Sequence, residues 1–230
     1  MAISEEFFTS RSLASQACAR HVAAAIKQQL DASPEAALIV GGGSTPAECF
    51  GILANSDLEW HRVTILPSDE RCVHAAHDAS NEGMIRRLLV TGRAATAKLV
   101  PMYNEELSPD NQCRRLAERL DLISRPFAIS LLGMGADGHF ASLFPDTEKL
   151  DEGLNPDSNR DCMFVRTTGS SHPRISLTMP VLLDSSEVLL LFFGDAKREV
   201  YELAKQSASP FPLSKLLQQE RTPVRAIWAP

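Results

Sequence analysis

The residues best suited to chemistry lie in a glycine-rich segment, Gly133 to Pro145, which reads GMGADGHFASLFP. It follows an apolar run from Phe127 to Leu132 that is typical of a buried strand. In open α/β sheets, ligands bind at the carboxyl ends of strands. A histidine in such a turn, close to a carboxylate, is suited to proton transfer near neutral pH. We therefore predict that Asp137 and His139 are catalytic.

Three glycines of this segment also match a different motif, the G-x-G-x-x-G pattern of dinucleotide-binding proteins. That pattern requires a continuous helix directly after it, with its N-terminus under a pyrophosphate. Here Pro145 interrupts the segment soon after Gly138 and favours extended backbone at Phe144. The sequence therefore argues against a nicotinamide or flavin site.

A second glycine-rich turn, Gly41 to Pro46, lies between a predicted strand and a predicted helix. Its glycines let the backbone approach a ligand, and the N-terminus of the following helix favours an anion. We predict that Gly42, Gly43, Ser44 and Thr45 bind a phosphate group. The alternative is a tight turn with no ligand, and the absence of G-K-[ST] excludes a nucleotide P-loop.

Charged residues follow the strand predicted at Val63 to Leu66. Charges at that position are costly unless they are paired or functional. We predict that Asp69 orients a hydroxyl group or water, and that Arg71 binds a phosphate or a developing oxyanion. The alternative is a set of ion pairs within the protein.

Two more cations are candidates for anion binding. Arg174 precedes a short β-like run, and Lys197 falls in the first turn of a predicted helix, where the helix dipole disfavours a cation. A bound anion would offset that cost, although a simply solvated lysine is the alternative. Cys72, His74 and His77 have metal-like spacing, but without a second cluster we assign them to a loop and predict no metal site.

The overall composition is that of an ordinary globular chain of 230 residues, which we assign to a single domain spanning residues 1–230. A net charge of −6 argues against a nucleic-acid face. The first residues do not resemble a secretory signal, and no apolar run is long enough to span a membrane. The five cysteines include no C-x-x-C pair, so we expect reduced thiols in a cytoplasmic protein, with Cys18 and Cys113 as small apolar fillers.

Predicted helices and strands alternate along the chain. Helices are expected after Ser12, from Pro46 to Ala54, after Ser80, after Ser108 and from Asp195 to Lys205; strands are expected at 36–40, 63–66, 98–100, 127–132, 162–166, 188–193 and 224–228, with a surface loop near 151–159. Uniformly apolar strands between amphipathic helices indicate an α/β fold with a mostly parallel sheet and helices on both faces. Four of the candidate segments follow four different strands, so one pocket can collect them.

These motifs together resemble the 6-phosphogluconolactonases. The resemblance rests on GGGSTP at 41–46, DER at 69–71, SN at 80–81, the segment 133–145, RIS at 174–176 and GDAK at 194–197. It implies a Rossmann-like fold and hydrolysis of 6-phosphoglucono-δ-lactone without a metal or organic cofactor. Asp137 would then orient His139 as the general base, Arg71 or backbone N–H groups would stabilise the oxyanion, and Arg174, Lys197 and the 42–45 turn would hold the phosphate.

Two alternatives remain at this point. The glucosamine-6-phosphate deaminases are similar, but they read Ala-Phe-Asn-Glu-Pro where this chain has Ala-Ser-Leu-Phe-Pro, so Phe144 replaces a carboxylate. They also have a tyrosine at the position of Arg71. A non-catalytic sugar-phosphate sensor would need a DNA-binding module, which the acidic chain and its first 35 residues do not provide.

Overall fold

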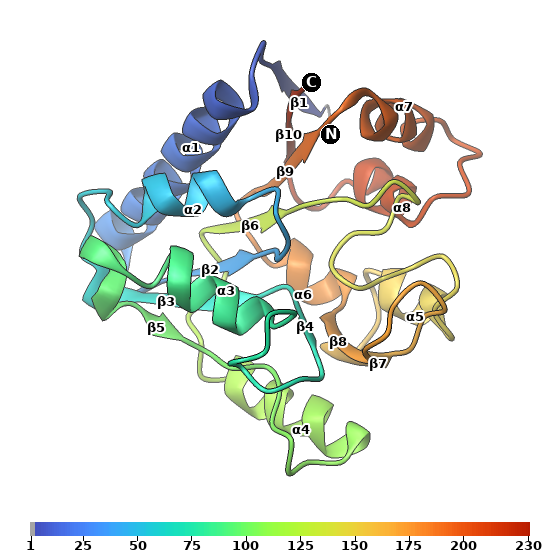
Figure 1. Cartoon of the computed structure of the whole chain (residues 1–230), viewed down its shortest axis with the longest axis horizontal. Coiled ribbons are helices and arrows are strands. Elements are labelled where there is room, and N and C mark those ends of the chain that lie inside the picture. Colours follow the sequence, from blue (N-terminus) through green and yellow to red (C-terminus); the bar gives the residue numbers. More distant parts are fainter. Residues whose placement is uncertain (1–2) are drawn as a thin grey trace.

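The computed structural model describes residues 3–230 and has an α/β fold built on a seven-stranded parallel sheet (Figure 1). The strand order across this sheet is β1-β10-β9-β6-β2-β3-β5, and every neighbouring pair is parallel. The strands are β1 (Ser4–Phe7), β2 (Ala36–Val40), β3 (Val63–Pro67), β5 (Lys98–Leu99), β6 (Ile129–Leu132), β9 (Val188–Phe193) and β10 (Val224–Ala229). The last strand, β10, lies between β9 and the first strand, β1.

Side chains of the central strands alternate between two hydrophobic cores, one on each face of the sheet. Leu189 and Leu191 of β9 belong to one core, whereas Leu190 and Phe192 belong to the other. The first core is covered by α1 (Arg11–Ala32), α2 (Ala47–Leu53) and α3 (Asn81–Leu88); the second is covered by α4 (Pro109–Leu120), α6 (Met179–Leu183), α7 (Asp195–Ala204) and α8 (Pro212–Gln218) (Figure 1). Both faces are therefore covered, which confirms the predicted fold class.

A second sheet, which the sequence did not predict, packs against the second core. It consists of β4 (Asp69–Arg71), β8 (Arg174–Leu177) and β7 (Cys162–Val165), all antiparallel. The register places Arg71 opposite Arg174 and Asp69 opposite Ser176. Two of the segments predicted to bind anions are therefore adjacent strands of this small sheet.

Some predicted boundaries were wrong for local reasons. Helix α1 begins earlier than expected, because Ser10 rather than Ser12 accepts the capping hydrogen bond, from the Leu13 N–H. Asp195 was expected to cap α7, but it is the first residue of that helix and Gly194 is the N-cap, whereas Ser80 caps α3 as predicted. The surface loop expected near 151–159 begins with a short helix, α5 (Leu150–Leu154), in which Leu154 is buried. Within residues 3–230, no helix is long and apolar enough to cross a membrane.

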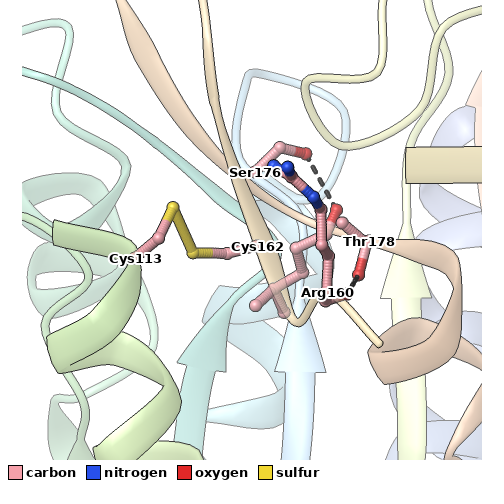
Figure 2. The surroundings of a disulfide bond; sticks show 6 residues. Cys113, Arg160, Cys162, Ser176 and Thr178 are labelled. Carbon is pink, nitrogen blue, oxygen red and sulfur yellow. Dashed lines mark hydrogen bonds between the residues drawn. A yellow bond between two sulfur atoms is a disulfide. The ribbon is translucent and has the colours of Figure 1, made fainter. Parts of the chain in front are cut away.

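The structure pairs two cysteines that were expected to be free. Cys113 of α4 and Cys162 of β7 form a disulfide with a Cα–Cα distance of 5.6 Å (Figure 2). Helix α4 packs directly on β7, so residues 49 positions apart become neighbours. The expectation of five reduced thiols, with Cys113 as an apolar filler, was therefore wrong for this pair, whereas Cys18, Cys49 and Cys72 are free.

We expect alkylation of the denatured, unreduced protein to modify three cysteines, and five after reduction, as counted by mass spectrometry. Cys113→Ser should lower the free energy of unfolding by roughly 2–4 kcal/mol, because the cross-link restricts the unfolded chain. Cys72→Ser, which removes a free and half-buried thiol, is the control and should leave the disulfide intact. Five reactive thiols without reduction would contradict this pairing.

Candidate active site

The carboxyl ends of β2, β3, β6 and β9 meet at one cavity of about 230 Å³. Its lining includes every predicted site residue except Asp137, which contacts the lining residue His139. The lining residues are Gly41, Gly42, Gly43, Ser44, Thr45, Ser68, Asp69, Arg71, Asn81, Gly133, Met134, Gly135, His139, Ala141, Arg174 and Lys197. The parallel sheet thus gathers segments from positions 41 to 197 of the chain around one space.

His139 and Asp137 form a hydrogen-bonded pair in the turn after β6. The distance from His139 Nδ1 to Asp137 Oδ1 is 2.6 Å. An Nδ1–H that donates to the carboxylate leaves Nε2 as a proton acceptor. Burial opposes ionisation of Asp137, but the hydrogen bonds and charge of His139 outweigh burial and hold the pKa of Asp137 below its usual value. The carboxylate can therefore orient the ring and stabilise its protonated form.

Glycine at position 135 is needed for this pair to fit. A Cβ on Gly135 would lie 2.2 Å from His139 Nδ1 and 2.4 Å from Asp137 Oδ1, so any side chain there would displace both groups. The Gly135 N–H donates to the His139 carbonyl oxygen, which closes the turn. On its other side, the imidazole packs against the Phe144 ring at a centroid distance of 4.1 Å.

Asp69, a lining residue on β4, is held by buried hydrogen bonds from two other residues. Its Oδ1 accepts from the Ser68 hydroxyl at 3.0 Å, and its Oδ2 accepts from the Ser142 hydroxyl at 2.6 Å. Oδ2 also lies 3.6 Å from Nη1 of Arg174, which makes an ion pair. Because both carboxylate oxygens are engaged, Asp69 is less free than His139 to accept a proton from water.

Three cations face the cavity without full neutralisation. Arg71 and Arg174 lie opposite each other on β4 and β8. Burial and the nearby charge of Arg71 lower the pKa of Arg174, although Asp69 and Glu70 partly oppose this. Burial, with Arg11, likewise lowers the pKa of Lys197, and Asp137 raises it in part. An anion placed among these groups would reduce their mutual repulsion.

The glycine-rich turn after β2 approaches the first turn of α3 closely. A Cβ on Gly42 would lie 2.0 Å from Asn81 Oδ1, so glycine is required for this contact. The Asn81 side-chain amide donates to the Asp69 carbonyl oxygen at 2.8 Å. Gly43 has a φ of +84°, a conformation that glycine adopts without strain.

Sequence reasoning assigned no role to Asn81 or Ser142, which line the cavity or contact its charged groups. Both residues lie inside motifs that carried the family resemblance, which was the only available signal. Their partners are more than ten residues away in sequence, so local patterns could not reveal them.

Cys72, His74 and His77, which have metal-like spacing, lie in the loop between β4 and α3. Within residues 3–230, no three His, Cys, Asp or Glu side chains come together as a metal-binding group. His74 and His77 each accept a backbone N–H through Nδ1, from Ala76 and Ala79 respectively. Burial raises the pKa of the Cys72 thiol to about 11, with a contribution from the charge of Glu70. These side chains are therefore part of a structured loop.

The fold and the cavity define an α/β protein with a histidine–carboxylate pair and a cluster of cations at the carboxyl ends of parallel strands. The sequence model of the family described as glucosamine-6-phosphate isomerases/6-phosphogluconolactonase matches residues 9–228. The chain belongs to this family.

Individual relatives and solved structures agree with that assignment. A 6-phosphogluconolactonase of Caulobacter vibrioides is 38% identical over 82% of this chain and 81% of its own length. A 6-phosphogluconolactonase of Rhizobium meliloti is 32% identical over the full length of both chains. The crystal structure of a 6-phosphogluconolactonase from Shewanella baltica superposes with a TM-score of 0.95 at 33% identity, covering 100% of this chain and 98% of the other.

Gly42→Ala should lower the free energy of unfolding by roughly 1–3 kcal/mol, because the new methyl group overlaps Asn81 and forces the turn or the helix to move. Chemical denaturation measures the change. Gly51→Ala is the matched control, since a Cβ on Gly51 in α2 meets nothing within 4 Å. We expect that control to be neutral or stabilising by up to about 1 kcal/mol. Equal effects of the two substitutions would contradict the close contact at Gly42.

Proposed function

We propose that this protein hydrolyses 6-phospho-D-glucono-1,5-lactone to 6-phospho-D-gluconate, a reaction of the oxidative pentose phosphate pathway. The main structural support is the His139–Asp137 pair, which lies at a cavity that also contains three cations. The relatives with this name match most or all of the chain. The substrate is a small anionic molecule, which suits such a cavity in an otherwise acidic protein.

In the proposed mechanism, His139 removes a proton from a water molecule as its oxygen attacks the lactone carbonyl carbon. The carbonyl oxygen becomes negatively charged, and Arg71 or N–H groups of the glycine turns stabilise it. When the tetrahedral intermediate collapses, the bond from the carbonyl carbon to the ring oxygen breaks. The protonated imidazole returns its proton to that leaving oxygen, while Asp137 keeps the ring oriented. No metal or organic cofactor takes part.

Arg174, Lys197 and the turn formed by Gly42, Gly43, Ser44 and Thr45 would hold the 6-phosphate. Guanidinium and ammonium groups make charge-assisted hydrogen bonds to phosphate oxygens. Asp69 keeps Arg174 in place through their ion pair and, as a lining residue, is positioned to orient a substrate hydroxyl group. Attraction between the phosphate and these two cations would thus offset the repulsion between the cations.

The environment of Phe144 argues against the deaminase alternative. Its ring packs against His139 on one side, and the Arg174 guanidinium lies 5.1 Å from its centroid. The deaminases carry a glutamate at this position, so this chain lacks the carboxylate that their sequence pattern places beside the histidine. Release of ammonia from glucosamine 6-phosphate would restore that alternative, and tight binding without turnover would favour a sensor.

We also propose a cytoplasmic location, because a phosphorylated sugar does not cross a lipid bilayer unaided. Thiol reductants in that compartment would keep most disulfides open, so the alkylation result predicted above applies to protein purified under oxidising conditions. Neither Cys113 nor Cys162 lines the cavity, so the proposed reaction does not depend on their cross-link.

His139→Ala should lower kcat for freshly prepared 6-phosphogluconolactone by roughly 10²–10⁴-fold, because the general base is lost. Turnover is measured by acid release and corrected for spontaneous hydrolysis. His61→Ala, at an exposed position outside the cavity, should retain wild-type kcat. Near-wild-type turnover by His139→Ala would place the base elsewhere, with Asp69 as the next candidate.

Lys197→Met should raise KM for the phosphorylated lactone by about tenfold or more with a smaller change in kcat, because a charged hydrogen bond to the substrate is removed. Lys215→Met provides a matched control on the exposed surface of α8. Lys197→Met should hydrolyse the unphosphorylated gluconolactone as the wild type does. An unchanged KM for the phosphorylated substrate would exclude Lys197 from its binding.

A further inference from the structure

Glu70 has no part in the mechanism above, yet its carboxylate is almost fully buried in β4. Asp69 and Arg71, its neighbours on the strand, line the cavity, whereas Glu70 does not. Alternate residues of a strand point to opposite sides, so Glu70 lies behind the site. Burying a carboxylate costs free energy unless hydrogen bonds satisfy it. The donors that satisfy Glu70 therefore indicate its structural role.

Four donors satisfy the Glu70 carboxylate. Oε1 accepts the N–H groups of Arg71 at 2.6 Å and Asn81 at 2.8 Å. Oε2 accepts the Glu82 N–H at 2.6 Å and the Ser80 hydroxyl at 3.0 Å. Three of these donors belong to the first turn of α3 and its N-cap, where backbone N–H groups lack partners within the helix. Glu70 therefore fastens the start of α3 to β4.

The attachment of α3 to β4 also fixes the Ala79 carbonyl group, which holds the Arg71 side chain. The carbonyl oxygen of Ala79, directly before Ser80, accepts a hydrogen bond from Arg71 Nη1 at 2.5 Å. The buried Nε of Arg71 has no hydrogen-bond partner among the described residues. Within residues 3–230, the Ala79 carbonyl oxygen is therefore the only hydrogen-bond acceptor for this guanidinium.

Arg71 also lies opposite a second cation, Arg174. Like charges opposite each other on neighbouring strands repel. Without a fixed acceptor at Ala79, the flexible arginine side chain would move away from Arg174 and out of the cavity. Glu70 thus fixes the start of α3, the start of α3 fixes the Ala79 carbonyl, and that carbonyl fixes the Arg71 guanidinium.

We propose that Glu70 is a positioning residue that keeps the Arg71 guanidinium aimed into the cavity by anchoring the segment Ala79–Glu82. This inference rests on the proposed function, in which Arg71 is a candidate to stabilise the negative charge that develops on the lactone carbonyl oxygen. Glu70 acts on the ligand only through Arg71 and does not touch it.

A double-mutant cycle tests this dependence by calorimetric binding of 6-phosphogluconate, which offers both a phosphate and a carboxylate to Arg71. Glu70→Gln keeps the shape but turns an amide N–H₂ toward two of the four donors. Arg71→Met should raise Kd by roughly 10- to 100-fold, because a hydrogen bond to a charged group strengthens binding by about that factor. Glu70→Gln alone should raise it by about 3- to 30-fold on the same scale.

The decisive comparison is the double variant. If Glu70 works through Arg71, then Glu70→Gln/Arg71→Met should bind no more weakly than Arg71→Met alone, because interacting residues are not additive. A purely structural carboxylate would weaken binding by the same factor in both backgrounds. That additive result, or an unchanged Kd for Glu70→Gln, would overturn the proposal.

Two further variants guard against misfolding and general charge effects. Ser80→Ala removes one donor to Glu70 and should give a smaller increase in Kd that also disappears in the Arg71→Met background. Glu82→Gln is the matched control, since among residues 3–230 the Glu82 carboxylate accepts only from Arg86, and Glu82 does not line the cavity; the Kd of this variant should match the wild type. A wild-type protein that binds 6-phosphogluconate but does not hydrolyse the lactone would refute the proposed function, while the binding cycle would still decide the role of Glu70.

Discussion

The site depends on one constraint, the parallel pairing of seven strands. Parallel pairing makes the carboxyl ends of β2, β3, β6 and β9 point the same way, so the turns that follow them share one edge. Each turn then contributes a different kind of group: backbone N–H groups after β2, a carboxylate after β3, a histidine after β6 and a lysine after β9. The small antiparallel sheet adds the two arginines from the side. A shift of register in any central strand would therefore disperse the site rather than merely loosen the core.

The cavity concentrates positive charge in a protein that is acidic overall. Arg71, Arg174 and Lys197 face a common space, and burial disfavours the charged forms of the last two. Such an arrangement costs stability in the free protein, because the cations repel one another. An anionic ligand removes this repulsion, and the relief adds to the free energy of binding. The buried carboxylates of Asp69 and Glu70 limit that cost, because their charges favour the charged form of Arg174, and Asp69 also forms an ion pair with it.

The features that local sequence determines were predictable. The turn carrying Asp137 and His139, and the glycine turn after β2, each directly follow an apolar strand, and the structure places both at the expected edge. The alternation of apolar strands and amphipathic helices also predicted correctly that helices cover both faces of the sheet. Contacts between distant segments were not predictable: the disulfide joins residues 49 positions apart, and Ser142 meets Asp69 across 73 positions. Of the second sheet, β7 and the β-like run at β8 were expected, but β4 is only three residues long, and its antiparallel pairing with β8 joins segments about 100 positions apart. At α1, two serines compete for one cap, and sequence alone did not choose between them.

The position of β10 between β1 and β9 affects how the chain can fold during synthesis. Ser4 of β1 pairs with Arg225 of β10, which leaves the ribosome 221 residues later. At typical elongation rates, β1 waits roughly 10 to 45 s before its partner exists. The edge of β9 that β10 will occupy is uncovered for a shorter time, because Val224 follows its partner Val188 after 36 residues. The sheet therefore cannot be completed in chain order from the amino-terminal end, because this side closes only once β10 has been synthesised.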